Sequence, residues 1–251
     1  MESAHLVKVF AILEATAGLP GGLPLTELAS LVGLPKSTAH RLLKTLCTLG
    51  YMTNCGRGVY RQTSMIKRLA IGVNDPHWIA IAEPVMKQLY ELTEETINLA
   101  ILRFEKIFYL HVIETKKTLR RAVAPMMSDP CFSTALGRAI IAFLPDDRQH
   151  FLLRHATIEK RTPHTIVDPA KIKRILKEVA SEGVAYEEDQ TDLGVACVAA
   201  PVYDNEGVVA AISLSAPQVR LDKAKISRWK IAVRESAQTI SSRLQSSESL
   251  K

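Results

Sequence analysis

The chain has 251 residues, of which 47% are hydrophobic and 23% charged, a composition typical of globular proteins and unlike that of disordered chains. No apolar run approaches the roughly 18–20 residues that a membrane-spanning helix needs, and the N-terminus lacks the basic start and apolar core of a secretion signal. We therefore expect a cytoplasmic protein with no membrane partner. The four cysteines are scattered, which favours reduced thiols over a disulfide or metal framework; they are Cys47, Cys55, Cys131 and Cys197.

Positive charge is concentrated near the N-terminus. The first 80 residues contain eight Lys/Arg and four Asp/Glu, which accounts for +4 of the net charge of +6. A local excess of this kind suits a polyanionic partner such as double-stranded DNA, although many domains carry one without such a partner.

Residues 25–46 predict two helices around a tight turn. Apolar residues at helical spacing predict an earlier helix over 4–16, which the Gly/Pro-rich segment 18–22 ends. A second helix is expected over 26–31. Gly33 then supplies the turn, because glycine adopts a left-handed conformation at little cost.

The third helix is expected to begin near Pro35 and to run to about Leu49, before Gly50. Proline is tolerated in the first turn of a helix, and the hydroxyl of Ser37 could cap free N–H groups there. The apolar side chains of this helix share one face, which we expect to be buried; they are Ala39, Leu42, Leu43 and Leu46.

The polar face of the third helix carries the chemistry of DNA recognition. A recognition helix enters the major groove with its N-terminal residues toward the base edges, where basic and hydroxyl side chains contact bases or phosphates. The candidates on this helix are Lys36, Ser37, Thr38, His40, Arg41 and Lys44. The alternative is an ordinary amphipathic helix with a solvated basic face. The order of helix, turn, helix and hairpin favours DNA binding.

The hairpin follows directly. Residues 51–52 and 59–61 predict two short strands around the turn 56–58, which completes a winged helix-turn-helix. Arg57 and Arg61 are candidates for contact with a phosphate or the minor groove. For Arg57, a solvated turn residue is the alternative.

A helical connection is predicted next. A helix is expected over 64–73, an interruption at 74–76, and a second helical segment over 78–92 that contains Pro84. We therefore predict a winged helix-turn-helix domain at 1–63, a helical linker at 64–79 and a second domain at 80–251.

The second domain mixes strands and helices, which predicts the α+β class with helices packed on an antiparallel sheet. Three strands are expected over 98–103, 107–113 and 119–124. Three helices are expected over 133–144, 146–154 and 168–182, the last capped by Asp168 and ended by Gly183. Two apolar strands over 195–203 and 208–215, joined by a turn at 204–207, precede a closing helix over 222–245.

Three stretches resemble the IclR family of bacterial transcriptional regulators: GLPKSTAHRLLKTL (33–46), PCFSTALGRA (130–139) and GVACVAAPVYDNEGVVAAISLSAP (194–217). The resemblance covers nearly the whole chain. It implies a winged helix, a linker helix and a GAF/PAS-like effector domain. It further implies a homodimer or a dimer of dimers on a palindromic operator, and a small-molecule effector, often a carboxylate or an aromatic acid, that alters DNA binding.

The resemblance also implies an effector pocket between a helix start and the sheet. Its residues would be Met127, Ala135, Leu136, Gly137, Asp189, Cys197, Ser213 and Ser215. A helix N-terminus suits a carboxylate, and the two serines, two apart on a strand, point to one face. The alternatives are a buried core thiol for Cys197 and inter-strand hydrogen bonding for the serines. The chain departs from the family at Asp189-Gln190, where Glu is common, and at Arg138, where Lys is frequent.

These features favour a ligand-responsive transcriptional repressor. The alternative is an enzyme or redox sensor that uses Cys131 or Cys197 as its nucleophile, which requires a base and a lowered thiol pKa. The sequence contains no GxSxG, HExxH, P-loop or GxGxxG motif, and we expect neither enzymatic activity nor a cofactor or metal. A protein-interaction module that has lost DNA binding is a third possibility, which the intact basic helix argues against.

Overall fold

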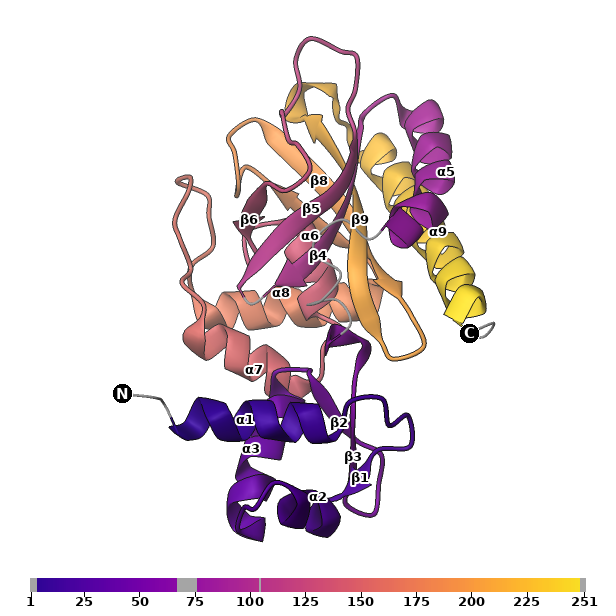
Figure 1. Ribbon diagram of the computed structural model, residues 1–251. Helices are drawn as coiled ribbons and strands as arrows, with labels where there is room; N and C mark the ends of the chain where they lie inside the picture. The colour runs from indigo at the N-terminus through magenta and orange to yellow at the C-terminus, as the bar shows by residue number, and fades with distance from the viewer. Residues whose placement is uncertain (1–3, 67–75, 104, 249–251) are drawn as a thin grey trace. The chain divides into compact units, whose positions relative to one another are not determined.

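The computed structural model of this chain describes residues 4–66, 76–103 and 105–248 (Figure 1). The chain divides into two compact units, Met1–Gly72 and Val73–Lys251. Of the helix predicted over 64–73, residues 64–66 are helical, and the remainder lies outside the described residues together with the interruption at 74–75. The bounds of the linker therefore stay a prediction.

The described part of the first unit confirms the three predicted helices: α1 (Ala4–Ala15), α2 (Leu25–Leu31) and α3 (Lys36–Thr48). Three strands form a small antiparallel sheet in the order β1-β3-β2: β1 (Leu23–Pro24), β2 (Met52–Asn54) and β3 (Val59–Gln62). β1 was not predicted, because two residues are too few to show the alternation of a strand.

One apolar core joins these helices to the hairpin. Ile12, Leu28 and Leu43 are fully buried in it, and Met52 and Tyr60 enter it from the strands. Gly33 has a φ of +65°, the left-handed conformation predicted for the turn. The predicted cap at Ser37 was wrong: α3 begins at Lys36, so Pro35 occupies the capping position, and it forms no side-chain bond.

Among the described residues of the second unit, six strands form one antiparallel sheet in the order β6-β5-β4-β9-β8-β7. They are β4 (Thr96–Arg103), β5 (Lys106–Ile113), β6 (Ser128–Pro130), β7 (Ala185–Glu188), β8 (Val195–Tyr203) and β9 (Val208–Pro217). The four strands β4, β5, β8 and β9 were predicted. β7 was missed because two of its four residues are acidic, and β6 because it is only three residues long.

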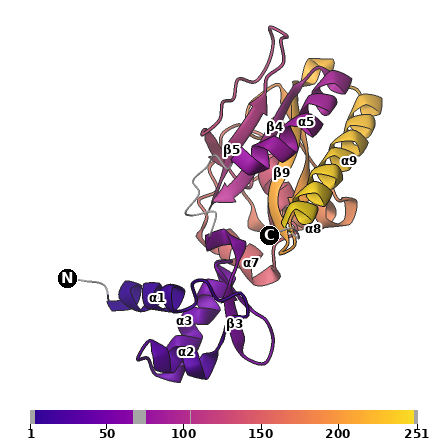
Figure 2. The same ribbon diagram turned by 45° about the vertical axis from the view of Figure 1, so that its right-hand side comes forward.

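Helices cover both faces of the sheet. On one face, α5 (Pro76–Thr93, with Pro84 inside) and α9 (Lys223–Glu248) lie side by side (Figures 1 and 2). On the other face, α6 (Ala135–Ile141) contacts the central strands, and α7 (Asp146–His155) and α8 (Pro169–Glu182) complete the layer. A short 3₁₀ turn, η1 (Gln218–Arg220), leads into α9. These elements confirm the predicted α+β class.

The two faces differ because side chains alternate along a strand. In β4, Ile97 and Leu99 pack in the core under α5 and α9, whereas Ala100 packs in the core under α6. The same alternation places Asn98 on the α6 face. This face carries the polar residues that form the candidate site.

The strand predicted over 119–124 was wrong, because these residues are irregular and mostly exposed. Val123 is buried, but its apolar neighbour Leu119 is exposed. The place beside β5 is taken instead by β6, whose Pro130 pairs with Lys106. The irregular segment turns the side chain of Arg121 toward the buried carboxylate of Asp129.

The predicted helix ends follow ordinary capping rules. The helix expected over 133–144 is shorter, since Thr134 caps it by accepting a 3.1 Å hydrogen bond from the Gly137 N–H. The Asp168 cap is confirmed by its 2.8 Å bond from the Ala170 N–H, and Gly183 ends α8 with a φ of +71°.

In the described part of the chain, no helix combines the length and apolar character needed to cross a membrane.

We predict that Gly137→Ala destabilises the second unit strongly. A Cβ at this position would lie 1.9 Å from the Cys131 carbonyl oxygen, so the backbone of α6 or of residue 131 must move. We expect a loss of about 3 kcal/mol in the free energy of unfolding. Urea titration followed by tryptophan fluorescence measures it, because Trp78 and Trp229 both lie in this unit.

Gly194→Ala is the matched control. Gly194 has a φ of +76°, a left-handed conformation, and its Cβ would meet no atom within 4 Å. We expect a loss of only about 1 kcal/mol, the cost of a left-handed alanine. Equal losses for the two variants would contradict the packing argument.

Candidate DNA-recognition helix and effector site

The exposed face of α3 is a continuous polar stripe. Ala39, Leu42, Leu43 and Leu46 are buried, so helical periodicity leaves the opposite face to solvent. The structure exposes five of the six predicted candidates there: Lys36, Ser37, His40, Arg41 and Lys44. Thr38 is half-buried at the edge of the stripe.

The predicted wing arginines occupy different places on the hairpin. Arg57 is exposed at the tip with a φ of +51°, between Gly56 and Gly58, which also have positive φ. Arg61 is half-buried in β3, where it pairs with Thr53 of β2. Arg57 therefore lies at the tip of the hairpin, and Arg61 lies on β3, further from the tip.

A polar strip crosses the α6 face of the sheet. It consists of Asn98, Cys197, Ser213 and Ser215, so the two serines and the cysteine predicted for the effector pocket do come together. The Asn98 Nδ2 donates to the Oγ atoms of Ser213 (3.2 Å) and Ser215 (3.1 Å), and the Cys197 thiol donates to Ser215 Oγ (3.3 Å). Inter-strand hydrogen bonding, the alternative considered for the serines, is thus present.

Asn98 was missed by sequence reasoning, although its even position among the odd apolar residues of β4 signals a second face. Its side chain is buried, and among the described residues its Oδ1 has no hydrogen-bond partner. A buried acceptor without a partner is costly. A ligand hydroxyl or amine would satisfy it.

The start of α6 is already occupied by its own chain. Ala135, Leu136 and Gly137 are all buried, and the Gly137 N–H is bonded to Thr134. Met127 is half exposed, and its carbonyl accepts a 3.1 Å bond from the Tyr109 N–H at the edge of the sheet. The helix start therefore lies in the core on this face of the sheet, against which Cys197 packs, and Met127 is held by its backbone next to Tyr109.

The carboxylate of Asp189 closes a loop. Its Oδ1 accepts the Gly194 N–H at 2.5 Å, its Oδ2 accepts from Gln218 Nε2 at 3.0 Å, and its φ of +58° is that of a turn residue. The acid that β7 brings beside Cys197 is Glu187, which pairs with it in register. Sequence reasoning missed Glu187 because β7 itself was missed.

Glu187 is deeply buried, and its environment changes its chemistry. Burial raises the pKa of its carboxyl to about 7, against the attraction of Arg138. Arg138 is buried as well, and burial lowers its pKa while Glu187 opposes the shift. The Arg138 guanidinium donates to the Phe132 carbonyl at 2.8 Å and to the side chain of Gln190.

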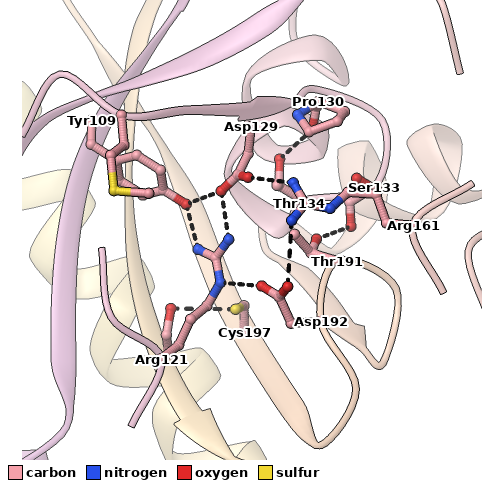
Figure 3. Close-up of polar contacts among 12 residues, drawn as sticks. Tyr109, Arg121, Asp129, Pro130, Ser133, Thr134, Arg161, Thr191, Asp192 and Cys197 are labelled. Atoms are coloured by element: carbon pink, nitrogen blue, oxygen red, sulfur yellow. Dashed lines mark hydrogen bonds and ion pairs between the residues drawn. The ribbon is translucent and has the colours of Figure 1, made fainter. Parts of the chain in front are cut away.

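A second group of charges lies next to the strip, and we call it the arginine–aspartate cluster (Figure 3). Its members are Tyr109, Arg121, Asp129, Arg161 and Asp192. Asp129 accepts from Tyr109 Oη (2.7 Å), Arg121 Nη2 (2.6 Å) and Arg161 Nη1 (2.9 Å). Asp192 accepts from Arg121 Nε (2.5 Å) and Arg161 Nη2 (3.4 Å).

The charge of Arg121 in the cluster acts on titratable groups at the strip. Burial alone would raise the pKa of Asp129, but Arg121, Tyr109 and Arg161 outweigh it, so the pKa lies below its ordinary value. The charge of Arg121 also acts to lower the pKa of both Cys197 and Glu187, whose pKa values burial raises. The cation of the cluster therefore lies within electrostatic reach of the strip.

The surroundings of Cys131 and Cys197 disfavour ionisation of both thiols. Burial raises the pKa of Cys131 to about 12 and that of Cys197 well above its ordinary value. A reactive cysteine needs a lowered pKa. The raised pKa values of Cys131 and Cys197 therefore favour their interpretation as protonated core thiols. In the described part of the chain, no three His, Cys, Asp or Glu residues are grouped to hold a metal ion.

Comparison with known proteins identifies both units. The family model described as "Bacterial transcriptional regulator IclR C-terminal" matches residues 73–242, and the "IclR helix-turn-helix domain" matches residues 5–54. The chain belongs to the IclR family of bacterial transcriptional regulators. The resemblance found in the three sequence stretches is thereby confirmed.

IclR-family relatives match along nearly the whole chain. The HTH-type transcriptional regulator KdgR of Escherichia coli K12 is 31% identical over 96% of this chain and 92% of its own. The DNA-binding transcriptional repressor YiaJ of the same organism is 32% identical over 96% of this chain and 88% of its own. Both relatives are regulators, and neither is named as an enzyme.

Solved IclR structures share the fold. IclR of Thermotoga maritima has a TM-score of 0.67 at 25% identity and covers 96% of this chain and 98% of its own. An IclR homolog of Microbacterium hydrocarbonoxydans, complexed with 4-hydroxybenzoate, has a TM-score of 0.63 at 19% identity and covers 97% of this chain and all of its own.

We predict that Glu187 makes the second unit less stable as the pH rises. Its pKa is raised in the folded state, so its contribution to stability is fully present below its unfolded value and is lost as the pH rises through about 7. We expect wild type to lose on the order of 2 kcal/mol between pH 5 and pH 8, since each pKa unit corresponds to ~1.4 kcal/mol. Glu187→Gln should remove most of this slope in urea titrations.

Glu188→Gln is the control, because Glu188 lies on the same strand but is exposed. It should keep the wild-type slope. A Glu187→Gln protein with an unchanged slope would show that another group titrates.

Proposed function

We propose that this chain is a transcriptional repressor that binds a palindromic operator in double-stranded DNA and is released by a small organic acid. The observation that carries the proposal is the exposed basic stripe of α3, which lies opposite its buried face. A relative named as a repressor, YiaJ, supports the sign of control. A DNA-binding regulator of bacterial genes acts in the cytoplasm, where the DNA lies.

The proposed DNA contacts follow from helix geometry. The N-terminal turns of α3 would enter the major groove, where Arg41 and Lys44 address guanine edges or phosphates. Lys36, Ser37, Thr38 and His40 complete the stripe, and Arg57 and Arg61 of the hairpin would contact the flanking backbone. A single helix reads only a few base pairs, so specific binding favours a homodimer or a dimer of dimers on a palindromic site.

The proposed effector is a carboxylate. An IclR homolog binds 4-hydroxybenzoate, and the polar strip with the neighbouring arginines offers both cations and hydrogen-bond donors for such a group. The effector residues that we propose are Asn98, Glu187, Cys197, Ser213 and Ser215. Ala135, Leu136 and Gly137 would form the floor, whereas the carboxylate of Asp189 holds its own loop.

We predict that Arg41→Ala combined with Lys44→Ala weakens binding to the DNA upstream of the chain's own gene. Each lost contact should cost about 1–3 kcal/mol, so the double variant should bind at least ~10-fold more weakly. Electrophoretic mobility shifts over a salt series measure both effects. If both side chains contact phosphates, the slope of log affinity against log salt should fall by about 2.

Arg174→Ala combined with Lys177→Ala removes the same charge from exposed positions on α8 and serves as the matched control. This variant should bind DNA like wild type. The proposed recognition helix is wrong if the α3 variant keeps full affinity, or if the two double variants weaken binding equally.

A further inference from the structure

The two carboxylates of the arginine–aspartate cluster differ in burial. Asp129 is 6% exposed and holds three donors, whereas Asp192 is 38% exposed and holds two. Both acids share the same two cations, Arg121 and Arg161. The cluster therefore contains one anchored acid and one accessible acid on a common pair of arginines.

The accessible acid lies on a loop that is held independently of its carboxylate. Asp192 follows β7 and precedes β8. On one side of it, the Thr191 hydroxyl donates to the Ser133 carbonyl at 3.1 Å. On the other side, the Gly194 N–H is bonded to Asp189. The side chain of Asp192 can thus turn away while the backbone of the loop stays fixed.

The guanidinium of Arg121 is well suited to bind another carboxylate in place of that of Asp192. Its Nε and Nη2 atoms address two different acids, while its Nη1 donates to Tyr109 Oη at 2.7 Å, so the orientation of the guanidinium is fixed by its buried partners. A guanidinium binds carboxylates in general, because its planar donors match their geometry. Removal of Asp192 leaves Nε of this oriented cation without an anion.

We propose that Asp192 is a built-in occupant of a carboxylate-binding site formed by Arg121 and Arg161, and that an organic acid binds by replacing it. The charge of the cluster is unchanged by the exchange, since one carboxylate leaves the arginines as another arrives. This inference rests on the proposed effector function, to which it adds the residues that receive the acid group and the residue that competes with it.

The exchange has a consequence for the loop between β7 and β8. Asp192 links this loop to Arg161, which lies in the segment between α7 and α8, and to Arg121, which lies between β5 and β6. When a ligand takes over the arginines, the loop loses both ion pairs. The exchange therefore removes the ion pairs that join this loop to the other two segments, while Asp129 still holds Arg121 and Arg161.

Chemical rescue tests the proposal with formate, the smallest carboxylate. Asp192→Ala should melt at a lower temperature than wild type in chloride. Replacing 100 mM chloride with 100 mM formate should raise its melting temperature by about 4 °C if formate is present at ~10 times its dissociation constant. Wild type should shift by less than about 1 °C, because Asp192 already occupies the site.

Two variants separate this site from a general effect of formate. Asp192→Ala combined with Arg121→Gln should lose the rescue. Glu114→Ala opens another loop ion pair of similar exposure, that of Glu114 (42% exposed) with Arg120, and should show no formate-specific shift. If Asp192→Ala does not fold in chloride, its yield of folded protein on refolding in formate against chloride gives the same comparison.

Rescue that depends on Arg121 would support the proposal. No formate-specific shift, or the same shift in the Glu114→Ala and Arg121→Gln backgrounds, would overturn it. The measurement contains no DNA, so a chain that failed to bind its operator could still show rescue. Failed rescue in a protein that shifts its operator normally would overturn only the exchange and leave the proposed regulator intact.

Discussion

The second unit depends on the alternation of side chains along β4, β8 and β9. Odd residues of β4 such as Ile97 and Leu99 fill the core beneath α5 and α9, while Asn98 points to the opposite face. In β9 the apolar Ile212 and Leu214 belong to the first face and the serines to the second. Because the period is two, the polar strip cannot shift by one residue without turning the core outward.

That constraint explains why much of the fold is predictable from the sequence. The long strands and helices bury a stripe or a face, so their residues repeat with a period that can be recognised. Ser213 and Ser215 could be placed on one face by the same rule. α3 is the clearest case, because its buried leucines fix which side chains face solvent, and hence which face can meet DNA.

The errors have a different physical origin. β1 and β6 are too short to show a period, and the acids of β7 look like those of a loop until Glu187 is buried beside Cys197. The segment 119–124 has the composition of a strand, but Arg121 is bound by two acids, which fixes an irregular path.

The arginine–aspartate cluster could not be found from a local pattern. Its members come from β5, β6 and three connecting segments, and Tyr109 and Asp192 are separated by 83 positions of sequence. Only the pairing of strands brings such residues together. The resemblance to the IclR family implied Asp189, whereas the register of β7 with β8 places Glu187 beside the thiol of Cys197.

The edge strands of the six-stranded sheet are β6 and β7. Both edge strands are short, three residues in β6 and four in β7, and both are poor templates for another strand. Pro130 in β6 has no N–H to donate, and the exposed charge of Glu188 lies on β7. Growth of this sheet from one chain into the next is therefore disfavoured, so association between the second units of two copies would use helices or loops rather than the edges of this sheet.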